Sequence, residues 1–289
     1  MPNPPMPRTL TFSLTLLAMI AFAGNSLLCR LALKDTGIDA ASFTSIRIAS
    51  GALALWLIVR LRGGARVTSG SWPSALALFA YAACFSFAYI SLPAATGALL
   101  LFGAVQATMI GYGLWTGERL RMRQSLGLVC ASAGLVGLML PGVAAPPLFS
   151  ALLMLSAGIA WGVYSLRGKG VADPTGATMG NFLHAVPIAI AMSAIAFPWV
   201  SLDRNGVCYA IASGALTSGV GYAIWYTALR GLKATSAAAV QLSVPVFAAI
   251  GGIAVLGEAI SLRLLIASTA ILGGIALVIV EKAAIPQPR

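Results

Sequence analysis

Long stretches without a single charged residue are the feature that most limits what this chain can form. Twenty-one uncharged residues separate Arg8 from Arg30, and fifty-one separate Arg66 from Glu118. A helix needs about 20 apolar residues to cross the hydrocarbon core of a bilayer, so the longer stretch holds two spans, which we divide at Pro93. Hydrophobic residues make up 59% of the chain and charged residues 9%. This balance excludes a soluble enzyme, a nucleic-acid-binding protein and a disordered chain.

The whole chain therefore predicts an all-α integral membrane protein with ten transmembrane helices. The first span also has features of a signal peptide, because Arg8 precedes an apolar core and Ala21-Phe22-Ala23 resembles a cleavage site. The apolar run continues unbroken to Cys29, so we expect a retained first helix. The expected spans cover residues 9–29, 41–59, 67–92, 94–117, 124–140, 148–166, 175–200, 206–229, 234–257 and 264–280.

Basic residues are concentrated in alternate loops. Of the 18 Lys and Arg residues, 13 fall in the loops and termini on one side of the predicted membrane and four on the other, while Arg47 lies within a span. Loops rich in Lys and Arg stay in the cytoplasm. We therefore expect a multi-pass protein of the cell inner membrane with both termini cytoplasmic.

The two halves of the chain carry matching charged sites. A shift of 140 residues places Gly117-Glu118 on Gly257-Glu258 and Arg123 on Arg263, in a chain with only seven acidic residues. Ten helices then divide into two units of five, residues 1–145 and 146–289. An odd number of spans per unit turns the second unit upside down. Inverted repeats are typical of secondary transporters, which bind substrate near the midplane between the halves.

Two segments of the chain form a recognisable pattern. One is Val244-Pro245-Val246-Phe247 followed by Leu256-Gly257-Glu258, and the other is the run from Asp39 to Arg47. They resemble the fourth and second helices of the EamA repeat of the drug/metabolite transporter superfamily. The resemblance covers nearly the whole chain as two copies, although the first copy has Val105 where the second has Pro245. Its closest branch is the aromatic amino acid exporters. The resemblance implies ten helices, termini inside, and export of amino acids, metabolites or drugs.

Aromatic and polar side chains within the spans are the candidate substrate ligands. Helices 67–92 and 206–229 are repeat equivalents, and each carries an aromatic stripe that could stack on a flat substrate across a central cavity. The alternative is that the stripes face lipid or pack between helices. Pro245 would leave the carbonyl of Gln241 free to accept a hydrogen bond from an ammonium group. The expected substrate-binding residues are Asn25, Tyr81, Phe85, Tyr89, Gln106, Trp161, His184, Tyr222, Trp225, Gln241 and Ser243.

A second set of residues is expected to act in gating or as hinges. Arg47 lies near the outer end of its span, and we expect it either to snorkel to the interface or to pair with Glu258 as an outer latch. In Gly117-Glu118 and Gly257-Glu258 we expect the glycine to end one helix and the glutamate to cap the next. His184, the one histidine, either titrates during transport or is a hydrogen-bonded packing residue. The gating or hinge candidates are Arg47, Glu118, Pro245 and Glu258.

Acidic residues are absent from the middle of every predicted span, because all seven fall in loops or at helix ends. This disfavours proton antiport through a central carboxylate. We expect facilitative export of aromatic and other neutral amino acids, or similar small metabolites, by alternating access. The sequence has no metal motif, no nucleotide-binding loop and no enzyme-like cluster of reactive residues. We therefore expect no cofactor, no metal and no catalytic residues.

The expected partners are a small-molecule substrate and the lipid bilayer, without nucleic acid, and a monomer is compatible with the sequence. Two alternative functions stay open. One is a non-catalytic membrane subunit, such as a sensor or a lipid-flipping partner. The other is the same fold exporting drugs or other metabolites by proton antiport. An enzyme acting on lipid is disfavoured because its active site needs a cluster of reactive side chains at one membrane face.

Overall fold

Every regular element among the described residues is a helix, which confirms the predicted fold class. A computed structural model describes residues 7–63, 70–117, 119–140, 142, 145–168, 171–229, 231–232, 237 and 240–283. Here η1 is a 3₁₀ turn and η2 is a π-helical segment. The elements are α1 (Arg8–Asp35), α2 (Ala40–Leu61), α3 (Trp72–Tyr89), α4 (Ala94–Trp115), α5 (Met122–Met139), α6 (Leu148–Gly168), α7 (Pro174–Ile195), η1 (Phe197–Trp199), α8 (Arg204–Ala212), η2 (Ser213–Val220), α9 (Gly221–Leu229), α11 (Val244–Leu256) and α12 (Leu262–Ala283).

Among the described residues, nine helices are long and apolar enough to cross a bilayer. One of them runs from Arg204 to Leu229 without a break through α8, η2 and α9. The shorter apolar helix α11, of 13 residues, occupies the ninth predicted span. A bilayer offers no water to backbone amides and carbonyls, and a helix satisfies both within itself. Each long apolar stretch is therefore helical.

Short acidic side chains fix where several helices begin. The carboxylate of Asp39 accepts a hydrogen bond from the amide of Ser42 at 2.9 Å, at the start of α2. Asp173 and Asp203 cap α7 and α8 in the same way. A carboxylate is favoured there because it accepts from unpaired amides and faces the positive end of the helix dipole. These three acids are thus helix caps.

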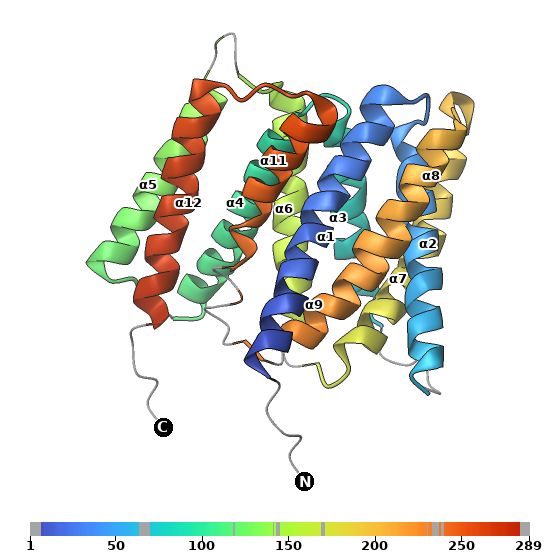
Figure 1. The fold of residues 1–289 in the computed structure, drawn as a ribbon, viewed down its shortest axis with the longest axis horizontal. Coiled ribbons are helices and arrows are strands. Elements are labelled where there is room, and N and C mark those ends of the chain that lie inside the picture. Colours follow the sequence, from blue (N-terminus) through green and yellow to red (C-terminus); the bar gives the residue numbers. More distant parts are fainter. Residues whose placement is uncertain are drawn as a thin grey trace.

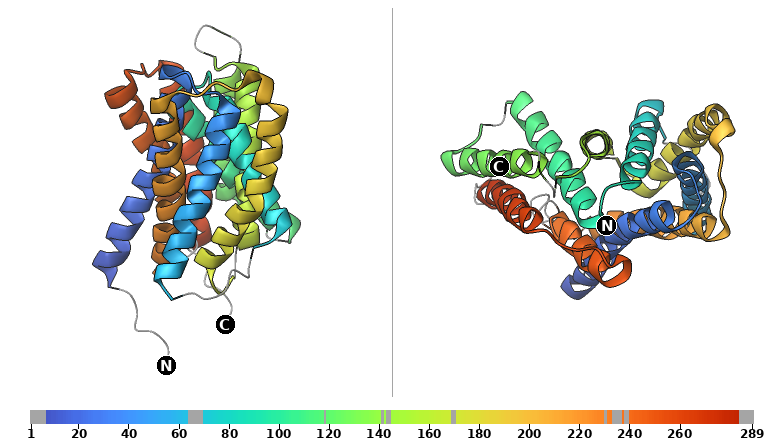
Figure 2. Two further views of the ribbon diagram at one scale, coloured as in Figure 1. Left: turned by 90° about the vertical axis from the view of Figure 1, so that its right-hand side faces the viewer. Right: turned by 90° about the horizontal axis from the view of Figure 1, so that it is seen from above.

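The helices stand side by side, and α1 begins at the same end of the bundle at which α12 ends (Figure 1). We call this end the inner end, following the predicted orientation, and the opposite end the outer end. α5 and α12 form a pair at one edge, whereas α1, α2, α3, α6, α7, α8 and α9 form a larger group (Figures 1 and 2). α4 and α11 pack against each other between them. α4 also packs on α6 and α11 on α1, so these two helices join the edge pair to the larger group.

Glycines bring the backbones of α5 and α12 into direct contact. A Cβ atom added to Gly127 would lie 2.5 Å from the carbonyl oxygen of Gly274, and one added to Gly134 would lie 2.7 Å from the Cβ of Ala270. Lipid tails are as apolar as the helices, so helices in a membrane are held together largely by such close packing of small residues. The edge pair therefore depends on the absence of side chains at these positions.

The ninth predicted span is interrupted just before Pro245. α11 begins at Val244, after a turn in which the amide of Ser243 donates to the carbonyl of Val240 at 2.9 Å. Pro245 thus lies in the first turn of a helix, where the missing N–H of proline costs nothing. The helix is broken just before Pro245, and the expectation that the carbonyl of Gln241 is free to accept a hydrogen bond stays a prediction.

Glycine ends α11, as predicted. Gly257 has a φ of 63°, in the left-handed region, and the amide of Glu258 donates to the carbonyl of Gly252 at 3.0 Å. Glycine is favoured in this left-handed conformation at the end of a helix because it has no Cβ. Gly117, with a φ of 95°, follows the end of α4. Glu118 lies outside the described residues, so its hinge role stays a prediction.

We expect Gly127→Ala to lower the stability of the protein by about 1–3 kcal/mol, because the added methyl group would overlap the backbone of α12. Gly137→Ala on the same helix is the matched control, since no described atom lies within 4 Å of its added Cβ. In this control alanine replaces a helical glycine and is expected to stabilise by about 0.5–1 kcal/mol. Thermal unfolding in detergent micelles measures both changes. Equal midpoints for the two variants would contradict a tight α5–α12 contact.

Candidate functional site

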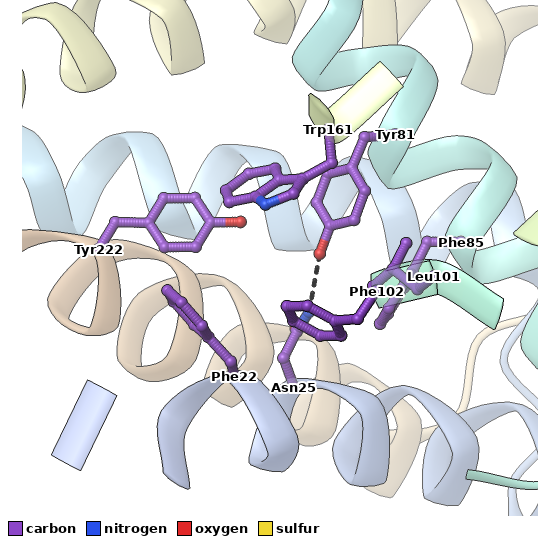
Figure 3. A pocket seen from close by; sticks show the side chains of 8 residues that line it. All are labelled: Phe22, Asn25, Tyr81, Phe85, Leu101, Phe102, Trp161 and Tyr222. Atoms are coloured by element: carbon purple, nitrogen blue, oxygen red, sulfur yellow. Dashed lines mark hydrogen bonds between the residues drawn. The ribbon is translucent and has the colours of Figure 1, made fainter. Parts of the chain in front are cut away.

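Eight side chains surround a cavity between α1, α3, α4, α6 and α9 (Figure 3). The cavity has a volume of about 20 Å³, which is room for about one water molecule. Both predicted halves of the chain contribute to it, and six of the eight side chains are aromatic. We call this set the aromatic cage. It consists of Phe22, Asn25, Tyr81, Phe85, Leu101, Phe102, Trp161 and Tyr222.

Trp161 lies beside Tyr81 and Tyr222 on one side of the cage (Figure 3). The centroid of its ring lies 4.8 Å from that of Tyr81 and 5.0 Å from that of Tyr222. Phe85 continues the cluster 5.4 Å beyond Tyr81, and Phe22 lies 5.8 Å from Tyr222. All four pairs are tilted or perpendicular, an arrangement that brings ring edges against ring faces. In this state the rings fill most of the space that they enclose.

Both predicted aromatic stripes reach the cage, but each does so with only part of its length. Trp225 lies one ring away, 5.9 Å from Phe22. Tyr89 packs behind Phe85 at 4.7 Å, and its hydroxyl donates to the carbonyl of Ala94 at 3.2 Å. The predicted substrate residues that line the cavity are Asn25, Tyr81, Phe85, Trp161 and Tyr222.

Besides Tyr89 and Trp225, four predicted substrate residues are not among the residues that line the cavity. The ring of His184 packs 4.8 Å from that of Trp72, and its Nδ1 donates to a carbonyl of its own helix at 2.8 Å. Gln241 and Ser243 also donate to nearby backbone carbonyls, at 3.4 and 2.7 Å. Gln106 is buried on α4, one turn beyond Phe102. His184 therefore has the environment of a hydrogen-bonded packing residue.

Sequence reasoning missed three residues that line the cavity: Phe22, Leu101 and Phe102. Helical spacing could have found two of them. Phe22 precedes Asn25 by three residues and Phe102 precedes Gln106 by four, so each lies on the same helix face as a residue that was selected. Polar groups and runs of aromatic residues are distinct in this sequence, whereas isolated apolar side chains in an apolar chain do not stand out.

Asn25 connects the cage to the π-helical segment η2. Its side-chain oxygen accepts hydrogen bonds from the hydroxyls of Ser213 at 2.7 Å and Thr217 at 3.2 Å, and its amide nitrogen donates to the hydroxyl of Tyr81 at 3.2 Å (Figure 3). A π-helix is rare and is often found at functional sites. In η2 it places several small polar residues on the side that faces α1 and α2.

Arg47 is buried beside the cage, and only 2% of it is exposed. Its Nη2 donates to the hydroxyl of Tyr81 at 3.0 Å and its Nε to the hydroxyl of Ser218 at 3.3 Å. The guanidinium carbon lies 4.9 Å from the ring centroid of Phe85. Both expectations for Arg47 were therefore wrong: it neither snorkels nor pairs with Glu258, because its face of α2 is turned toward α3 and η2.

Glu258 forms an ion pair with Arg30 and not with Arg47. Arg30 and Glu258 form an ion pair, with 3.2 Å between Nε and Oε1, and both side chains are 12% exposed. Arg30 also donates to the carbonyls of Tyr89 and Ile90 at 2.9 and 2.8 Å. We call this set of contacts the outer tie. It fastens the ends of α1, α3 and α11 together.

Glu258 caps a helix, but not the one expected. Its Oε2 accepts a hydrogen bond from the amide of Ala94 at 2.7 Å, at the start of α4. The helix that follows Glu258 in the chain, α12, receives its cap from Ser261, whose hydroxyl oxygen accepts from the amide of Leu264 at 3.1 Å. Three residues separate Glu258 from the start of α12, so its carboxylate is placed over the neighbouring helix instead.

Asp39 joins two loops at the outer end. Its second carboxylate oxygen accepts from the amide of Ser201 at 3.0 Å, and its own amide donates to the carbonyl of Ser201 at 3.0 Å. Partial burial by itself would raise the pKa of Asp39. The hydrogen bonds from Ser42 and Ser201 outweigh that effect and hold the pKa below its ordinary value.

A second, more polar cavity of about 70 Å³ adjoins the cage. It is lined by Tyr164, which lies one turn after Trp161 on α6, and the centroids of these two rings are 5.4 Å apart. The hydroxyl of Tyr164 accepts from Asn181 at 3.3 Å, and Arg167 donates from Nε to Ser74 at 3.0 Å. Because Tyr164 and Arg167 follow Trp161 on α6, the second cavity lies nearer than the cage to the inner end of that helix.

Comparisons with known proteins agree with this architecture. Residues 148–280 match the EamA-like transporter family. An uncharacterized protein of Pseudomonas aeruginosa is 54% identical over 278 residues, which cover 96% of this chain and 97% of that protein. An uncharacterized transporter of Archaeoglobus fulgidus is 28% identical over 263 residues, covering 86% of this chain and 90% of that one.

One solved structure, described as "Crystal structure of protein", superposes with a TM-score of 0.66 and 20% identity, over 96% of this chain and 100% of the other. At that identity the likeness shows the fold alone. The chain belongs to the EamA-like transporter family. It is a multi-pass membrane transporter of the drug/metabolite superfamily.

We expect Glu258→Gln to destabilise the protein by about 1.5–3 kcal/mol, the contribution of a hydrogen bond to a charged partner. Glutamine keeps the shape of the side chain but leaves Arg30 without its counter-charge. Asp35→Asn, at an exposed end of α1, is the control and is expected to change stability by less than about 0.5 kcal/mol. Thermal unfolding in detergent compares the two, and equal effects would remove the outer tie as a stabilising contact.

The contribution of Asp39 to stability is expected to depend on pH. Because its pKa is lowered in the folded protein, this contribution is fully present above the ordinary pKa of about 3.9 and is lost as the pH falls through the lower folded value. Asp39→Asn should therefore be less stable than the wild type at pH 6, and the difference should shrink at the acidic end of the accessible range. A difference that grows on acidification would contradict this reasoning.

Proposed function

We propose that this transporter is a facilitative exporter of aromatic and other neutral amino acids, or of similar small metabolites, and that it works by alternating access. The observation that carries the proposal is the aromatic cage around Asn25, where the two predicted halves meet. Aromatic faces stack on flat apolar groups, and a few placed polar groups orient a ligand. The ring of a phenylalanine or tryptophan substrate would replace contacts that the cage residues now make with one another.

Alternating access is supported by the way that equivalent helices pack. Under the 140-residue shift, α3 corresponds to the helix α8–α9 and α4 corresponds to α11. α3 and α4 both pack on α6, while α8–α9 and α11 both pack on α1. The same shift exchanges the contact between Gly127 and Gly274 with the contact between Gly134 and Ala267. Two inverted units, residues 1–145 and 146–289, account for both relations.

Uncoupled transport is supported by the charges near the site. Among the described residues, no carboxylate lines either cavity. Proton-coupled transporters place an ionisable acid within the membrane, on the substrate pathway. An exporter without such a group would run down the gradient of its own substrate.

The orientation in the inner membrane, with both termini cytoplasmic, is supported by basic residues at the inner end. α2 ends there with Arg60 and Arg62, and Arg121 and Arg123 flank the start of α5. Arg167 lies in the last turn of α6 at the same end. Loops rich in arginine are retained in the cytoplasm.

The test uses purified protein in liposomes without an ion gradient. Entry of labelled phenylalanine, tryptophan, threonine, methionine and lysine is followed, and saturable entry of all except lysine is expected. Trp161→Ala should lower aromatic flux by about 2- to 10-fold, equivalent to the roughly 0.5–1.5 kcal/mol of one aromatic contact. Trp199→Ala is the matched control, because Trp199 is 72% exposed in η1, away from the cage.

Three other outcomes of the flux measurement would each contradict part of the proposal. Flux that requires a pH or sodium gradient would overturn the uncoupled mechanism. Equal loss in the two tryptophan variants would separate the cage from the substrate path. No flux of any amino acid would favour another substrate or a non-transporting membrane subunit.

A further inference from the structure

Arg47 carries a positive charge in the membrane interior that no described side chain neutralises. In the described part of the chain the ion pair found is Arg30–Glu258, at the outer end. The contacts of Arg47 are two neutral hydroxyls, of Tyr81 and Ser218, and two ring faces. Its Nη1 is the one buried side-chain nitrogen or oxygen among the described residues that has no hydrogen-bond partner. A buried, unpaired charge is costly, and inside a membrane it marks a functional site.

The position of Arg47 relates this charge to the cage. Its guanidinium carbon lies 4.9 Å from the ring centroid of Phe85 and 5.2 Å from that of Tyr81, and both rings line the cavity. The hydroxyl of Tyr81 accepts from Arg47 at 3.0 Å and from Asn25 at 3.2 Å, so two N–H donors converge on one neutral oxygen. An anionic oxygen at this point would accept stronger hydrogen bonds from the same donors.

We propose that Arg47 is the ligand for a carboxylate group of the substrate, and that the site recognises aromatic monocarboxylates whether or not they carry an amino group. This rests on the proposed function for the aromatic part of the substrate. Nη1 and Nη2 would donate two parallel hydrogen bonds to the carboxylate, which is the preferred geometry of a guanidinium. Nη1 has no other partner, and Nη2 would exchange a neutral acceptor for a charged one.

The charge balance explains why the amino group is not required. Because no described carboxylate lines the cage, the site offers no counter-charge to an ammonium group. A substrate with one negative charge neutralises Arg47, whereas a zwitterion leaves one positive charge buried. A carboxylate such as 3-phenylpropionate is therefore expected to bind at least as well as phenylalanine.

The test measures binding without requiring transport. Thermal unfolding of the purified full-length protein in detergent is followed with 3-phenylpropionate, 3-phenylpropionamide, phenylalanine, phenethylamine or butyrate, because a ligand stabilises the state that binds it. In the wild type the carboxylates are expected to bind about 10- to 100-fold more tightly than the amide or the amine, the range for a hydrogen bond to a charged group. Arg47→Met should reduce this ratio to about one, with an unfolding temperature no lower than that of the wild type.

Two further variants serve as controls for Arg47→Met. Arg47→Lys keeps the charge but not the forked donors, so it should keep a reduced preference for the carboxylate if Arg47→Met fails to fold. Arg30→Met makes the same change at the outer tie and should leave the preference unchanged. Equal binding of 3-phenylpropionate and its amide by the wild type, or an unaltered preference in Arg47→Met, would overturn the proposal.

The outcome is separable from that of the proposed function. Stabilisation by butyrate that depends on Arg47, without stabilisation by the aromatic compounds, would support the carboxylate ligand and contradict the aromatic substrate. Amino acid flux in liposomes that is equal for the wild type and Arg47→Met would support the aromatic substrate and contradict the carboxylate ligand.

Discussion

The hydrocarbon interior of a bilayer leaves buried polar groups no partners except one another, and most of this structure follows from that constraint. Within each helix the backbone amides and carbonyls form hydrogen bonds with one another. Asn25 satisfies its amide with three side chains on two other helices, and Arg30 divides its donors between Glu258 and two backbone carbonyls. Arg47 is the exception, because its Nη1 has no partner among the described residues. The same bundle therefore contains polar contacts that hold helices together and one polar group, Nη1 of Arg47, whose hydrogen bonding is incomplete.

The two ends of the site differ in how they are closed. At the outer end the outer tie and the Asp39–Ser201 hydrogen bonds fasten helix ends that are far apart in sequence. Toward the inner end, the second cavity is separated from the cage by the rings of Trp161 and Tyr164. The first closure consists of charged and backbone hydrogen bonds and the second of aromatic side chains.

Sequence reasoning found the architecture because long uncharged stretches and the loop charges have one dominant cause, the membrane. Of the residues that line the cavity, it selected Tyr81, Phe85 and Tyr222 because aromatic residues at helical spacing are distinct in the sequence. It misplaced Arg47, because the depth of a residue along a helix does not say which neighbour its side chain will face. The sequence also did not predict Arg30 as the partner of Glu258. Their contact depends on how α1, α3, α4 and α11 pack, and no local sequence pattern encodes that packing.

The π-helical segment η2 has a consequence for the cage that follows from its geometry. In a π-helix each backbone hydrogen bond spans five residues instead of four, so Ser213–Val220 holds its eight residues in fewer turns than an α-helix would. Conversion of this segment to regular α-helix would rotate α9 about its axis relative to α8. Since α8 is anchored at the outer loop by its Asp203 cap, the rotation would fall on Tyr222 and Trp225. A change in winding in one helix would thus move the rings of Tyr222 and Trp225 together.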